Sequence, residues 1–67
     1  MNERLEQAKT LLDIAAKMRE VSGDILAVYE AHEISYAEFM QLINSAQDIM
    51  NVANSRAFKL YDEVIFG

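Results

Sequence analysis

The stretch Ile34-Ser35-Tyr36-Ala37-Glu38-Phe39 decides the fold of this chain, because it carries a complete helix start. Its spacing predicts a capping box, in which Ser35 caps the amide of Glu38 and the Glu38 side chain reaches back to Ser35. Ile34 and Phe39 have the spacing of a hydrophobic staple. The preceding segment ends at Ala31-His32-Glu33, so the connection is only a few residues long, which favours an antiparallel helical hairpin.

Downstream of this start, the apolar residues alternate steps of four and three, which is the pattern of a coiled-coil heptad. Few helix-breaking residues interrupt the pattern, since the chain has no proline and its second glycine is the terminal Gly67. The alternation predicts a long helix over residues 36–65, whose inward seam is Phe39, Ile43, Ala46, Met50, Ala53, Ala57, Leu60 and Val64.

The first half of the chain shows the same alternation, in Leu11, Ile14, Met18, Val21, Ile25 and Val28. We favour one continuous helix over residues 3–31, because the pattern keeps its phase through Gly23 and a glycine on an exposed helix face costs only about 1 kcal/mol. The alternative is a break at Ser22-Gly23-Asp24, with Asp24 capping a new helix, which would give three helices.

The composition fits one small all-α domain over residues 1–67. Apolar residues make up 52% and charged residues 25%, which excludes the composition of a disordered chain. The chain has no cysteine, so neither a disulfide framework nor a thiolate zinc site can stabilise it. Helix packing or self-association must therefore supply the stability.

The apolar residues outnumber the positions that one two-helix seam can bury. In an antiparallel hairpin the surplus widens the apolar face of both helices towards the end that holds the chain termini. A homodimer that forms a four-helix bundle is the expected way to cover it. The predicted oligomer interface is Leu5, Leu12, Leu42, Ile49, Phe58, Tyr61, Ile65 and Phe66.

The charges are distributed unevenly along the chain, whose net charge is −5. No Lys or Arg lies between Glu20 and Ser55, a window that corresponds to the turn half of the hairpin. We expect this half to steer basic protein surfaces towards it. The residues predicted to bind such a partner are Glu20, Asp24, Glu30, Glu33, Glu38 and Asp48.

The sequence offers no pattern typical of catalysis or of cofactor binding. The single histidine, His32, has no cysteine to join it, and we expect a turn residue that faces solvent. Gly-rich phosphate loops and Ser/His/Asp arrangements are absent. We therefore expect no enzyme activity, metal site, cofactor or small-molecule substrate. No apolar run is long enough to suggest a membrane span or a signal peptide.

These observations predict a non-catalytic protein–protein interaction module in the cytoplasm, which acts as an adaptor, antitoxin or phage-type inhibitor. A purely structural oligomerisation module is the alternative. Nucleic-acid binding is a weaker alternative, because acidic residues are interspersed among the basic ones. Its contact face would be Arg4, Lys9, Lys17, Arg19, Arg56 and Lys59.

Overall fold

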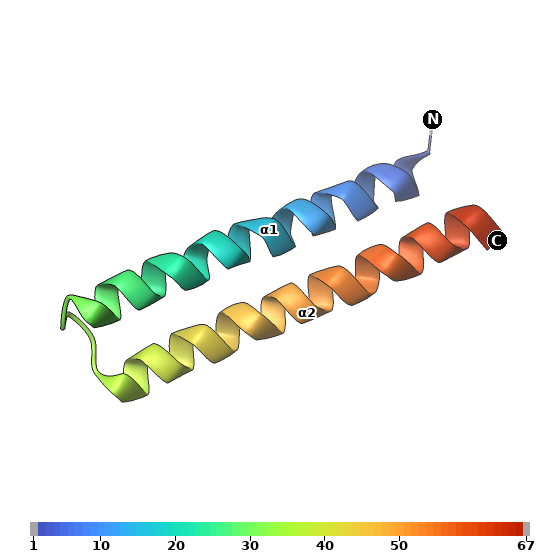
Figure 1. The fold of residues 1–67 in the computed structure, drawn as a ribbon. Coiled ribbons are helices and arrows are strands. Elements are labelled where there is room, and N and C mark those ends of the chain that lie inside the picture. Colours follow the sequence, from blue (N-terminus) through green and yellow to red (C-terminus); the bar gives the residue numbers. More distant parts are fainter. Residues whose placement is uncertain (1, 67) are drawn as a thin grey trace.

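The computed structural model describes residues 2–66 as two long helices packed side by side. Helix α1 spans Glu3–Glu30 and helix α2 spans Tyr36–Phe66, so the predicted all-α hairpin is confirmed to within one residue at each helix end. The chain folds back on itself, and both termini lie at the same end, which we call the open end (Figure 1). Helix α1 runs without interruption through Gly23, so the alternative with three helices is not adopted.

Local hydrogen bonds set the start of each helix. The Ser35 hydroxyl accepts from the Glu38 amide at 3.1 Å, and the Ser35 amide donates to the Glu38 carboxylate at 2.9 Å, which is the predicted capping box. Helix α1 starts differently, because the Asn2 side chain accepts from the amides of Arg4 and Leu5. This cap follows the ordinary preference of Asn for such positions, although the sequence analysis did not single it out.

The turn between the helices is a Schellman motif. The amide of His32 donates to the Tyr29 carbonyl at 3.0 Å, and the amide of Glu33 donates to the Val28 carbonyl at 3.2 Å. His32 occupies the left-handed position with φ of 62°, where glycine is the usual residue. The His32 side chain is exposed, as predicted for a turn residue.

Contacts at both ends fix the register of the two helices. Near the turn, the Tyr29 ring stacks on the Phe39 ring at a centroid distance of 4.5 Å. At the open end, Arg4 pairs with Glu63 at 3.3 Å, although both side chains remain substantially exposed. The helices therefore stay in contact along their whole length, and the hairpin measures 49 × 17 × 11 Å.

The core of the hairpin consists almost entirely of alanine. Among the described residues, the buried apolar side chains are Ala8, Ala15, Ile25, Ala46, Ala53 and Ala57. The register places Ala15 at the level of Ala53, so two small buried side chains lie opposite each other there. Methyl groups contribute little buried apolar area, so this core is a weak source of stability for an isolated hairpin.

The structure corrects the predicted seam of α1. Val21 and Val28 were expected to face inward, but 37% and 41% of their surfaces are exposed. Ile25 of that predicted seam is buried as expected, whereas the other buried residues of α1, Ala8 and Ala15, come from the neighbouring stripe. Helix α1 is therefore rotated so that Ala8 and Ala15 face α2, which leaves Val21 and Val28 at the edge of the contact between the helices.

Candidate interaction surfaces

A shallow groove crosses one face of the hairpin between the two helices. Leu11 and Ile14 of α1 form one wall, and Ile49 and Val52 of α2 form the other, with Ala53 at the base. Val52 is 66% exposed and Ile49 is 46% exposed, although both are large apolar side chains. The groove therefore offers apolar surface that the two helices of one chain leave uncovered.

The same face continues from the groove towards the turn. Leu42 lies seven residues before Ile49 on α2, and Val21 and Val28 continue the line of Ile14 on α1. A spacing of seven residues is close to two helical turns, so these side chains point to the same side. We call this surface the central apolar face, and its residues are Leu11, Ile14, Val21, Val28, Leu42, Ile49 and Val52.

A second apolar surface lies on the opposite face of the hairpin, near the open end. Ile49 and Phe58 are nine residues apart on α2, or about two and a half turns, so they point in opposite directions. The same spacing separates Leu5 from Ile14 on α1. We call this second surface the open-end patch, and its residues are Leu5, Leu12, Phe58, Tyr61 and Ile65.

The residues predicted to form one oligomer interface are thus divided between two faces. Leu42 and Ile49 belong to the central apolar face, whereas most of the others belong to the open-end patch. Phe66, at the end of α2, is 83% exposed and belongs to neither surface. Sequence reasoning missed this division because it took Leu11 and Ile14 as core residues of the seam, whereas both line the open groove.

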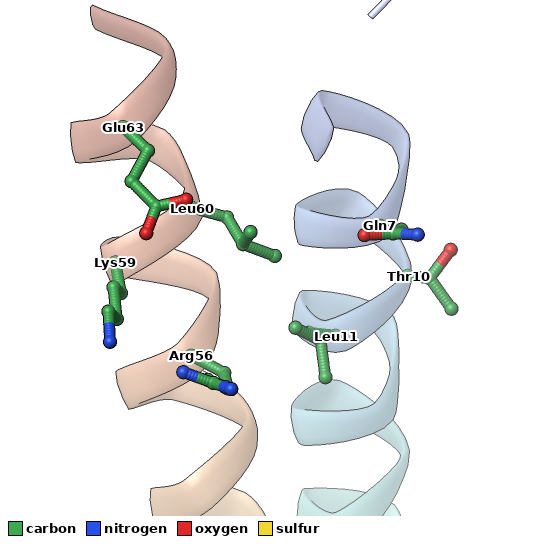
Figure 2. A pocket seen from close by; sticks show the side chains of 7 residues that line it. All are labelled: Gln7, Thr10, Leu11, Arg56, Lys59, Leu60 and Glu63. Atoms are coloured by element: carbon green, nitrogen blue, oxygen red, sulfur yellow. The ribbon is translucent and has the colours of Figure 1, made fainter. Parts of the chain in front are cut away.

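Polar residues surround the groove where it approaches the open end. Leu11 and Leu60 extend from α1 and α2 into the space between the helices, and Arg56, Lys59 and Glu63 line the α2 side (Figure 2). Arg56 and Lys59 are exposed and form no ion pair among the described residues. The central apolar face therefore has two cationic side chains beside its open end.

The six acidic residues of the turn half are all exposed. They do not gather on one side, since Glu20 and Asp24 lie one turn apart on α1 while Asp48 borders the groove on α2. Glu38 has a lowered pKa, because hydrogen bonding with the backbone amide of Ser35, and secondarily with the Ser35 side chain, favours its charged form. The turn half is thus acidic all round, with Glu30, Glu33 and Glu38 closest to the turn.

Over residues 2–66, no group of three or more His, Asp and Glu side chains is placed to hold a metal ion. No polar or charged side chain of that part of the chain is buried. Neither α1 nor α2 has a stretch that is apolar and long enough to cross a bilayer.

Comparisons with models of protein families, with curated proteins and with solved structures find no match to this chain.

Proposed function

We propose that this chain is a non-catalytic interaction module that self-associates through apolar surface and binds another macromolecule through its acidic turn half. The observation that carries the proposal is the inverted distribution of side-chain size. Alanines fill the core, while isoleucine, leucine, valine and phenylalanine side chains remain exposed. A contiguous apolar surface of this kind is typical of interaction sites.

The exposed area of the hairpin supports self-association. The scaling of accessible surface with mass gives about 4,300 Å² for a compact folded chain of 7.6 kDa. The hairpin exposes 5092 Å². The excess of about 800 Å² matches what each partner contributes to a standard protein–protein interface.

The charge distribution supports a basic protein surface as the partner. Six carboxylates surround the turn half, and no cationic side chain from the same window offsets them. Such a surface accelerates association with basic proteins and repels nucleic acid, whose phosphates carry the same sign. A cytoplasmic location fits this proposal, because a chain without cysteine gains nothing from an oxidising compartment.

The first experiment is the mass of the protein in solution, measured by light scattering across a range of concentrations. A dimeric mass supports self-association, and a well-folded monomer at every concentration contradicts it. The helical signal should fall on dilution together with the mass, because the alanine core alone stabilises the hairpin weakly.

The second experiment compares partner capture by two charge-reversal variants. Glu30→Lys with Glu33→Lys changes the turn half, whereas Asp13→Lys with Asp62→Lys makes the same charge change outside the 20–55 window. We expect a basic protein to bind the wild type and the second variant but not the first. Equal capture by both variants would mean that the acidic turn half is not the surface that binds the partner. Self-association without any specific partner would favour the structural oligomerisation module instead.

A further inference from the structure

We infer that the central apolar face is covered by a second copy of this chain, which lies antiparallel to the first so that each turn lies beside the open end of the other copy. The inference rests on the proposed self-association and names its surface and orientation. The symmetry axis would lie in the interface, perpendicular to the long axis of the hairpin.

The central apolar face is complementary to itself under this rotation. On α1 its residues run from Leu11 to Val28, and on α2 they run from Leu42 to Val52. The register fixed by Tyr29 and Phe39 brings the midpoints of these two runs to the same level along the hairpin. A two-fold axis at that level superposes the apolar runs of both helices, as a closed dimer interface requires, with Asp48 beside the axis where it borders the groove.

The charges beside this face select the antiparallel orientation. Arg56 and Lys59 lie beyond Val52 towards the open end, about as far from the midpoint as Glu38 and the turn lie on the other side. Rotation about the axis therefore brings the acidic turn of one copy next to the two cations of the other. In the parallel orientation, the acidic halves of both copies would lie side by side and repel each other.

The open-end patch is a poorer place for the same contact. It lies at one end of a hairpin that is 49 Å long, so a two-fold axis there overlaps only the ends of the two copies. Such a dimer would also leave Ile49, Val52 and Leu42 exposed. The central apolar face covers the middle of the molecule and buries the side chains that now line an open groove.

A matched pair of variants tests which face is used. Ile49→Glu places a charge in the central apolar face, and Phe58→Glu places the same charge in the open-end patch of the same helix. We expect Ile49→Glu to halve the mass measured by light scattering and Phe58→Glu to leave it dimeric. The reverse result would overturn the assigned face while leaving self-association intact. A monomeric wild type would instead overturn the proposed function itself.

A distance measurement tests the orientation without disturbing the interface. Because the chain has no cysteine, Ala31→Cys provides a single exposed attachment site for a spin label at the turn. Ala31 lies about 17 Å from the level of the proposed axis, so antiparallel copies place the labels about 35 Å apart. Parallel copies would hold both labels at one end, within about 20 Å of each other. The long distance supports the inference and the short one overturns it.

Discussion

Replacement of Gly23 by alanine should stabilise the protein, because the structure gives this glycine no conformational role. Gly23 lies inside α1, its φ is not positive, and a Cβ added there meets no atom within 4 Å. Glycine in a helix interior is less favourable than alanine by about 1 kcal/mol, since it loses more backbone freedom on folding. The expected gain for Gly23→Ala is therefore about 1 kcal/mol per chain.

The assay is thermal unfolding followed by circular dichroism at a fixed protein concentration, because the midpoint of an oligomer depends on concentration. A gain of this size should raise Tm by about 4–8 °C in a domain of this length. Ala16→Gly is the matched control, since Ala16 is another exposed position in the interior of α1. It should lower Tm by a similar amount, and the double variant should return close to the wild type because the sites are well separated.

The continuous helix is refuted if Ala16→Gly lowers Tm as expected while Gly23→Ala leaves Tm unchanged or lowers it. That result would mean that Gly23 ends one helix in solution and that Asp24 caps the next. The helical break considered from the sequence would then be correct.

The remaining predictions concern the turn, the core and acid stability, and all are measured as unfolding free energies by chemical denaturation. His32→Gly should stabilise by up to about 1 kcal/mol, because glycine relieves the left-handed conformation, and a destabilised variant would contradict the Schellman turn. Ser35→Ala should destabilise by about 1 kcal/mol through loss of the cap. Ala53→Leu should destabilise by about 1–3 kcal/mol by overpacking, and a stabilising result would mean that the helices lie further apart. The lowered pKa of Glu38 gives stability that is present above its ordinary value of 4.5 and is lost as pH falls through the lower folded value, so Glu38→Gln should show a weaker loss on acidification.

The helices and their connection could be predicted because local interactions specify them. The capping box needs only Ser35 and Glu38, which are three residues apart, and the structure contains both of its hydrogen bonds. The alternation of apolar residues continues almost to the end of each helix, so it also predicted the length of both helices. Gly23 did not interrupt α1, because on an exposed face its cost is smaller than that of ending and restarting a helix.

The orientation of α1 could not be decided from its own sequence. Two neighbouring stripes on this helix both alternate by threes and fours, one with Val21 and Val28 and the other with Ala8 and Ala15. The buried residues come from both stripes, Ala8 and Ala15 from one and Ile25 from the other, and the packing against α2 decides which of them face inward. The division of the predicted interface between two faces likewise depends on the rotation of each helix about its own axis. Only the packing of the two helices determines that rotation.

The proposed dimer and the proposed partner would use the same carboxylates. In the antiparallel dimer, Arg56 and Lys59 of one copy lie beside the turn of the other, where Glu38 and Glu33 are exposed. A basic partner that binds the turn half would therefore compete with the second copy for these charges. By linkage, a partner that weakens the dimer binds the separated chain more tightly than it binds the dimer. The apparent affinity of the partner should therefore fall as the concentration of this protein rises, because more of the protein is then dimeric. That dependence distinguishes a partner bound at the turn half from one bound at the open-end patch, which both copies leave free.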